Sequence, residues 1–146
     1  MSARAEERPS GAAQRPRPVI DPDSREFWRA AGRGILELSR CTACGRWEHP
    51  PRENCTKCGA VAHMEPSSGI GVVYSYIVLH HSTIPGFDGV LPFAIALVEF
   101  EGGCRLPARV TGEYDRETLI GSTVQAEFER LAPDLAPGLL VHLVGA

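Results

Sequence analysis

Four cysteines occur as two Cys-x-x-Cys-Gly motifs, at residues 41–45 and 55–59, with ten residues between Cys44 and Cys55. Two intervening residues let both sulfurs of a pair reach one ion, and the following glycine lets the backbone turn closely beneath them. Cys41, Cys44, Cys55 and Cys58 together make a tetrahedral four-sulfur site. Such a site suits Zn²⁺, or iron in a rubredoxin-like centre, and its closed shell leaves no position for a substrate. The spacing therefore predicts one structural metal.

Other roles for the cysteines are less favoured. A thioredoxin-type redox site needs a single Cys-x-x-Cys at the start of a helix, whereas both pairs here lie in glycine-containing turns. His49 lies between the pairs, but four thiolates already fill the shell, so we expect a surface histidine. Cys104 stands alone and is expected to be a small buried hydrophobe, because no base lies near it in the sequence.

Composition restricts the possible environments and partners. The 146 residues are 43% hydrophobic and 23% charged, and no apolar run approaches the roughly 20 residues that a membrane helix needs. The first residues lack the apolar stretch of a secretory signal, so we expect a reducing, cytoplasmic location. Counting Lys and Arg against Asp and Glu gives net charges of zero for residues 1–23, plus three for 24–58 and minus six for 59–146. An acidic C-terminal part would repel phosphates, which weakens a nucleic-acid function.

The order of elements predicts a mainly β protein in four parts. Residues 1–20 carry too few large apolar side chains to order themselves and are expected to be a disordered tail. A helix is expected within 21–34, capped by Asp23 and Glu26 and ended by glycines. Residues 35–66 form the zinc ribbon, and residues 67–146 form the barrel.

Five β-rich runs follow the ribbon, at residues 72–80, 92–100, 105–111, 124–128 and 139–144. Gly102 and Gly103 offer the positive φ angles of a hairpin turn, so the second and third strands should pair antiparallel. Residues 115–120 resemble one or two helical turns capped by Gly121. Five strands with a short helix after the third are typical of an OB-fold barrel, although a two-sheet sandwich would also hold them.

The motifs in their order resemble one known family, the zinc-ribbon plus OB-fold family catalogued as domain of unknown function thirty-five. The likeness covers about residues 24 to 146. It rests on Phe27-Trp28 before a glycine-containing turn, both cysteine motifs, Pro50-Pro51-Arg52, Gly69-x-Gly71-x-Val73-Tyr74-Ser75, Pro92-Phe93-Ala94, Val98-Glu99-Phe100 and Ile120-Gly121-x-x-Val124.

The resemblance implies an accessory subunit that binds a thiolase-fold partner acting on acyl-CoA thioesters, in a heteromeric complex. One branch of the family supports retro-aldol cleavage of steroid side-chain thioesters, and a thiolase is the other expected partner. The partner holds the catalytic groups in that branch, so no catalytic residue is assigned here. Candidate contacts with the partner or with CoA at a shared interface are Trp28, Arg46, Trp47, Arg52, His80, His81 and Phe87.

Two other functions remain open from the residues. Zinc ribbons and OB-folds often bind single-stranded nucleic acid, and Tyr74 and Tyr76 would share a strand face suited to stacking. An iron-loaded four-sulfur site would instead indicate a rubredoxin-like electron carrier.

Overall fold

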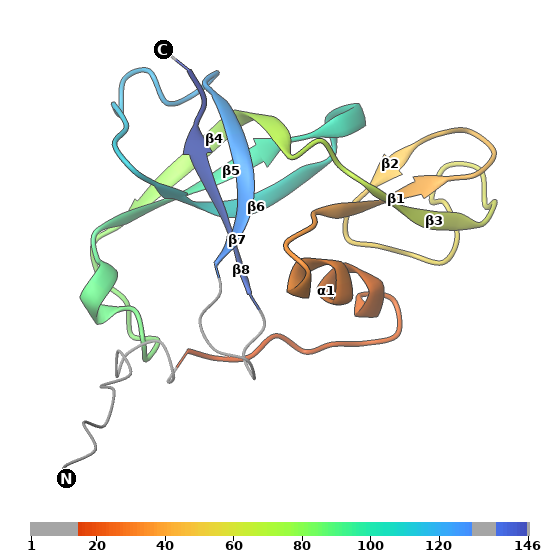
Figure 1. The fold of residues 1–146 in the computed structure, drawn as a ribbon, viewed down its shortest axis with the longest axis horizontal. Helices are drawn as coiled ribbons and strands as arrows, with labels where there is room; N and C mark the ends of the chain where they lie inside the picture. Colours follow the sequence, from red (N-terminus) through yellow and green to blue (C-terminus); the bar gives the residue numbers. More distant parts are fainter. Residues whose placement is uncertain (1–14, 130–136, 146) are drawn as a thin grey trace, which may run out of the picture.

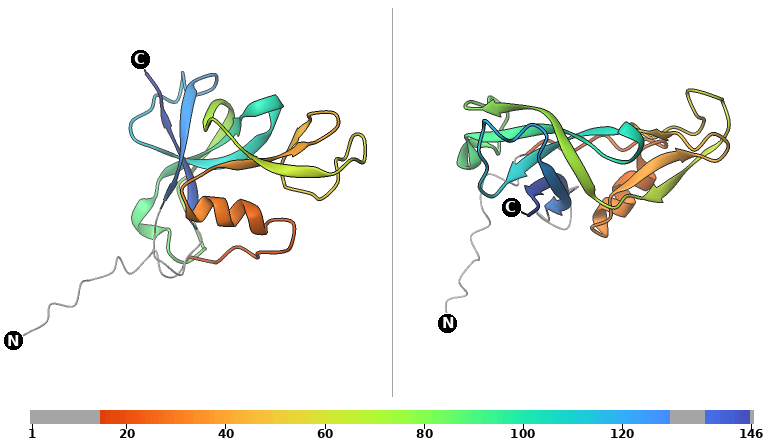
Figure 2. Two further views of the ribbon diagram at one scale, coloured as in Figure 1. Left: turned by 45° about the vertical axis from the view of Figure 1, so that its right-hand side comes forward. Right: turned by 90° about the horizontal axis from the view of Figure 1, so that it is seen from above.

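The computed structural model describes residues 15–129 and 137–145. Along the chain, an N-terminal segment leads into one helix, a small three-stranded sheet and a five-stranded barrel (Figure 1). The three-stranded sheet extends to one side of the barrel, and the helix lies beside both (Figures 1 and 2). The mainly β fold with an N-terminal helix is as predicted.

The barrel consists of β4 (Ile70–Leu79), β5 (Phe93–Glu99), β6 (Arg105–Thr111), β7 (Thr123–Glu129) and β8 (Gly138–Leu143). These strands close in the order β4-β5-β6-β8-β7, with β6 and β8 parallel and all other pairs antiparallel. This is the Greek-key order of an OB-fold, so the sandwich alternative is wrong. The expected hairpin between β5 and β6 is confirmed, and Gly102 and Gly103 have φ angles of +62° and +79° at its turn.

Alternation along β5 and β6 divides their side chains between the barrel core and its outer surface. On β5, Ala94, Ala96 and Val98 are completely buried, while their neighbours point outward. The inward positions of β6 alternate in the same way. Fully buried Leu119 is held beneath the barrel because Gly121 N–H donates to the Val73 carbonyl at 2.8 Å.

The short helix expected at residues 115–120 is absent, and the structure has a turn there. Asp115 Oδ1 accepts a hydrogen bond from the Glu117 amide at 2.9 Å, which gives the backbone a local alternative to a helix. The bonds to β4 then draw Leu119 inward. Side-chain capping and core packing therefore override the weak helical pattern.

A register shift in β4 changes the expected placement of two tyrosines. The pairing with β5 slips between Val73 and Ser75, which is a β-bulge. Tyr74 is consequently exposed, and the Arg105 guanidinium lies over it, 3.6 Å from the centroid of the Tyr74 ring. Tyr76 instead packs against the core, and its hydroxyl donates a hydrogen bond to the Arg116 carbonyl. The predicted shared face for base stacking is wrong.

Helix α1 (Arg25–Gly32) buries Phe27, Ala30 and Ala31. Its N-cap is Ser24, not Asp23, and the Asp21 carboxylate accepts from the Ser24 amide at 2.7 Å. The Phe27 ring lies 6.3 Å from the ring of Phe128, so the helix packs on β7. None of the described helices has the length and apolarity required to traverse a membrane.

The small sheet has the order β2-β1-β3, formed by β1 (Glu37–Cys41), β2 (Trp47–Glu48) and β3 (Ala62–Pro66), all antiparallel. It carries the two cysteine motifs at its end. Two serines that follow β3 bind the carboxylate of Glu101 beside the β5–β6 hairpin, at 2.7 Å from Ser67 Oγ and 2.6 Å from the Ser68 amide. The sheet is thus fixed to the barrel.

The predicted disordered tail is only partly covered, since residues 1–14 lie outside the described residues. Residues 15–20 have no helix or strand, but Arg15 is held against the barrel. Its Nε donates to the Gly86 carbonyl at 3.0 Å, and its Nη1 lies 3.3 Å from a Glu129 carboxylate oxygen. These contacts hold Arg15 in one position, which the composition of residues 1–20 did not predict.

Replacing Gly71 tests the packing between the start of β4 and the end of β5. A Cβ at this position would lie 2.5 Å from Val98 Cγ1 and 3.0 Å from the Glu99 carbonyl oxygen, so we expect Gly71→Ala to destabilise the fold by about 1–3 kcal/mol. Gly32→Ala is the matched control, because a Cβ there meets nothing within 4 Å. Urea unfolding of the metal-loaded protein gives both values, and equal stability of the two variants would contradict the tight packing.

Candidate metal centre and adjoining pockets

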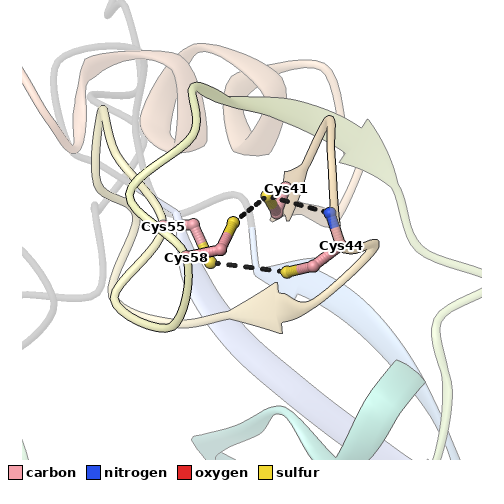
Figure 3. A group of neighbouring side chains, drawn as sticks. All are labelled: Cys41, Cys44, Cys55 and Cys58. Carbon is pink, nitrogen blue, oxygen red and sulfur yellow. Dashed lines mark hydrogen bonds between the residues drawn. The ribbon is translucent and has the colours of Figure 1, made fainter.

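The four cysteine sulfurs converge at the end of the small sheet (Figure 3). All four lie within 4.8 Å of one another, with Cys41 3.4 Å from Cys58 and Cys44 3.7 Å from Cys55. Cys41 and Cys55 are buried, while Cys44 and Cys58 are exposed. Each motif therefore supplies one inner and one outer sulfur to a single compact site.

Backbone amides point at the inner sulfurs. The Ala43 and Cys44 amides donate to Cys41 Sγ, and the Lys57 amide donates to Cys55 Sγ, each at 3.4 Å. Gly45 and Gly59 permit this geometry with φ angles of +71° and +78°. Donors arranged around a sulfur stabilise its thiolate, which is the form that binds a metal.

The thiols differ strongly in acidity. The hydrogen bond from the Cys44 amide, opposed by burial and helped by the Ala43 amide, lowers the pKa of Cys41 to about 6. For Cys58, the amide of Ala60 likewise lowers the pKa of the thiol. The hydrogen bond with Cys41 and burial outweigh that amide, and together they raise the pKa of Cys58 to about 11. Four sulfurs this close hold several negative charges only with a cation between them. The donor set fits one metal ion.

Trp47 joins the small sheet to the barrel. Its indole packs so closely on Gly102 that a Cβ there would lie 2.7 Å from Trp47 Cδ1. The Arg40 guanidinium lies 4.9 Å from the indole centroid on the sheet side and also pairs with Glu65 at 3.1 Å. Trp47 is therefore a contact between the two parts of the chain, a role that the sequence did not indicate.

His49 is not the surface residue that we expected. Its ring lies 5.4 Å from the ring of Phe27, and its Nδ1 is buried without a hydrogen-bond partner among the described residues. Burial lowers the pKa of His49 below its usual value of 6.5. The imidazole therefore stays neutral near pH 7 and packs as part of the contact between helix and ribbon.

A polar cavity of about 370 Å³ lies between the ribbon and the β5–β6 hairpin, and we call it the ribbon–barrel pocket. Arg46 and Arg52 of the ribbon and Arg105 of the barrel line it, together with a single described acid, Glu48. Glu48 is already occupied: the Thr56 hydroxyl and Arg46 Nε, the latter at 2.9 Å, donate to its carboxylate. Those hydrogen bonds, led by that of Thr56, lower the pKa of Glu48 despite its partial burial. The pocket is cationic overall.

Cys104 also lines the ribbon–barrel pocket, but its thiol is not activated as a nucleophile. The side chain is buried, as predicted, and burial together with the charges of Glu101 and Glu48 raises its pKa to about 11. A thiol with this pKa is protonated at neutral pH and is a poor nucleophile.

Two family models match the two parts of the chain. Residues 28–62 match the rubredoxin-like zinc ribbon domain of ChsH2, and residues 64–129 match the C-terminal OB-fold domain of ChsH2. A DUF35 domain-containing scaffold protein of Methanocaldococcus jannaschii is 33% identical over 105 residues, which are 70% of this chain and 74% of that protein. The chain belongs to the DUF35 family.

Two further matches come from proteins named for acyl-CoA or aldolase chemistry. A probable enoyl-CoA hydratase alpha subunit of Thermomonospora curvata is 37% identical over 124 residues, covering 84% of this DUF35 chain. The chain spans only 38% of that relative's length. A chain of the solved Ltp2-ChsH2(DUF35) aldolase superposes with a TM-score of 0.77 at 34% identity, covering 87% of this chain and 98% of its own.

The seven residues predicted to contact a partner or CoA lie in different parts of the DUF35 structure. Arg46, Trp47 and Arg52 meet at the ribbon–barrel pocket. Trp28 and Phe87 line a second, larger cavity on the barrel. His80 and His81 follow β4 as exposed residues and line neither cavity. The seven residues therefore do not form one site.

Sequence reasoning missed Arg105, which completes the ribbon–barrel pocket. It follows Cys104 directly after the β5–β6 turn, and it pairs with Glu99 at 2.9 Å. Gly102 and Gly103, which predicted the hairpin, indicate where Arg105 lies along the chain, at the start of the strand after the turn. The packing of Trp47 on Gly102 and the bonds of Ser67 and Ser68 to Glu101, however, bring this turn to the ribbon, and sequence patterns do not show them.

The burial of His49 predicts a pH dependence of stability. Its folded-state pKa lies below the unfolded value of about 6.5, so the unfolded chain binds the extra proton and stability falls as the pH drops below that value. The loss is at most about 1.4 kcal/mol per pH unit for one group. We expect His49→Phe to reduce the fall in unfolding free energy between pH 7.5 and 5.5, measured with urea and saturating Zn²⁺. His81→Gln, at an exposed site, should retain the wild-type fall, and an unchanged fall in His49→Phe would contradict the assignment.

Proposed function

We propose that this DUF35 chain is an accessory subunit that binds and supports a thiolase-fold enzyme acting on acyl-CoA thioesters. The observation that carries the proposal is the likeness to the Ltp2-ChsH2(DUF35) aldolase, which covers 98% of that structure's chain. A lipid-transfer-protein-like retro-aldolase of steroid side-chain thioesters is the partner that we favour, and a thiolase is the second. The proposed location is the cytoplasm.

Zinc is the proposed metal. The family model describes a zinc ribbon, and four thiolates in a closed shell suit Zn²⁺. Its role is to hold the loop that contains Arg46, Trp47 and Arg52 against the barrel. The metal would act through structure, because all four of its protein ligands are cysteines and no open coordination position remains.

The ribbon–barrel pocket is the proposed site for the phosphates of CoA. Three arginines and one glutamate line it: Glu48 is already bonded to Thr56 and Arg46, and Arg105 pairs with Glu99, which does not line the pocket. Guanidinium groups bind phosphate oxygens through paired N–H donors, which makes arginine well suited to a pyrophosphate. Arg52 is exposed and forms no ion pair with any described residue, so its charge is available to a ligand.

The side chains near this pocket support a binding role, with catalysis in the partner. Acid–base or nucleophilic work requires a group with a pKa matched to neutral pH and a neighbour that activates it. Cys104 has its pKa raised to about 11, and Nδ1 of the half-buried His49 has no hydrogen-bond partner among the described residues. Neither group is prepared for proton transfer.

Charge reversal at Arg52 tests the phosphate site. In the purified complex with its partner, we expect Arg52→Glu to weaken coenzyme A binding about ten-fold, or about 1.4 kcal/mol, in isothermal titration calorimetry. Arg116→Glu, an exposed arginine outside the pocket, should bind coenzyme A normally. Pantetheine lacks the phosphates, so its binding should be equal in both variants. Normal coenzyme A binding by Arg52→Glu would place the phosphates elsewhere.

Removing one metal ligand tests the supporting role. We expect Cys55→Ser to lose the metal, to unfold the ribbon and to abolish complex formation together, because structural metal affinity is folding free energy. The measurements are metal analysis and gel filtration after co-expression with each thiolase-fold protein of the source genome. Cys104→Ala is the control, since this thiol lies outside the metal site, and it should keep one zinc per chain and assemble normally.

Three outcomes would overturn these assignments. If the wild-type chain neither stabilises nor activates any thiolase-fold protein, the accessory function is wrong. If Cys55→Ser assembles like the wild type, the metal has no part in the interface. Red protein with one iron per chain would replace zinc by a redox centre.

A further inference from the structure

The larger cavity, of about 570 Å³, lies on the outer surface of the barrel, and we call it the barrel cavity. Outward-facing Phe93 and Ile95 of β5 form its floor with Leu140 of β8. Trp28 of helix α1 and Phe87 of the β4–β5 connection enclose it. Its volume is within the range of roughly 300–1,000 Å³ that is common for small-molecule sites.

The strand register explains why this surface is apolar. Ile95 pairs with Arg109 across β5 and β6, and Arg109 pairs with Leu140 across β6 and β8, so all three side chains share the outer face. Outer faces of antiparallel sheets are usually polar when they meet water. An apolar outer face enclosed by a helix, a loop and an N-terminal segment indicates a binding site.

Charged groups lie at one side of the barrel cavity. Arg15 and Arg109 share one oxygen of Glu129, at 3.3 and 3.0 Å, and the three side chains are only 12%, 19% and 23% exposed. Each guanidinium also lies over an aromatic ring, Arg15 at 4.7 Å from the centroid of Phe87 and Arg109 at 5.8 Å from that of Phe93. Both arginines are therefore fixed in place beside the apolar floor.

The charges in this group do not balance. Two guanidinium groups share one carboxylate, and Glu129 is the only acid among the described residues that line the cavity. Uncompensated charge that is largely removed from water is costly unless a counter-charge joins it. The surplus positive charge beside an apolar floor is complementary to a ligand with one anionic group and an apolar body.

We infer that the barrel cavity binds a small organic carboxylate with an apolar chain. The carboxylate completes the Arg15–Glu129–Arg109 group, and the chain lies over Phe93, Ile95 and Leu140. An oligonucleotide fits less well, because its many phosphates would meet a barrel region of net charge minus six. This site is separate from the ribbon–barrel pocket and does not depend on the proposed acyl-CoA partner.

Calorimetric titration of the metal-loaded chain, residues 1–146, with dodecanoate tests the inference. We expect saturable one-to-one binding, and at least ten-fold weaker binding of dodecanol, which has the same chain without the charge. Ile95→Trp places a large side chain on the cavity floor and should abolish dodecanoate binding. Ile77→Trp is its matched control, because Ile77 is the exposed cross-strand partner of Ile95 and does not line the cavity.

A charge variant separates recognition of the carboxylate from burial of the chain. Arg109→Gln should weaken dodecanoate binding about ten-fold and leave dodecanol unchanged, while Arg116→Gln, at an exposed residue that lines neither cavity, should change neither. Thermal unfolding of every variant identifies any that fails to fold, and Ile95→Trp and Arg109→Gln test the site independently.

Three results would overturn the inference: no saturable dodecanoate binding by the wild type, equal affinity for dodecanoate and dodecanol, or undiminished binding by folded Ile95→Trp. Displacement of dodecanoate by a single-stranded oligonucleotide at equal concentration would instead assign the surface to nucleic acid.

Discussion

The convergence of four sulfurs within 4.8 Å is the constraint on which the N-terminal half of the fold depends. The amides of Cys44 and Ala43 lower the pKa of Cys41 to about 6, while the hydrogen bond with Cys41 and burial outweigh the Ala60 amide and raise that of Cys58 to about 11, so the four thiols do not all ionise unaided. A bound cation removes this conflict and favours all four thiolates at once. The sheet β2-β1-β3 is too small to bury a sufficient core by itself, so the metal ties its two loops together.

The constraint extends from the metal to the barrel through a few contacts. Trp47 begins β2 only a short distance after Cys44, and its indole packs on Gly102. On the other side of the sheet, Ser67 and Ser68 bind Glu101, whose pKa these bonds lower although burial opposes them. Both connections end at the same β5–β6 hairpin. The position of Arg105 relative to Arg46 and Arg52, and hence the ribbon–barrel pocket, therefore depends on the folded ribbon.

Local patterns predicted much of this fold, because spacing and alternation are local properties. The cysteine spacing, the glycine pair at residues 102–103 and the strand periods identified the metal site, the hairpin and the OB-fold. The bulge that separates Tyr74 from Tyr76 and the turn at Asp115 depend on pairing and side-chain hydrogen bonds that periodicity does not encode. The Arg15–Glu129 contact joins residues 114 positions apart, so the single sequence offered no signal for it.

The two cavities divide recognition by chemistry. The ribbon–barrel pocket offers arginines and hydrogen-bonding groups at a junction that the metal holds, and polar anions are its natural ligands. The barrel cavity offers an apolar floor with fixed charge at one side, and an amphipathic anion satisfies both. Near the first pocket, the buried thiol of Cys104 is protonated and the imidazole of His49 is neutral at pH 7, so these two groups favour holding a ligand in that pocket over reacting with it. In the assembly that we propose, such a chain contributes binding energy and geometry, and the partner supplies the bond-breaking groups with matched pKa values.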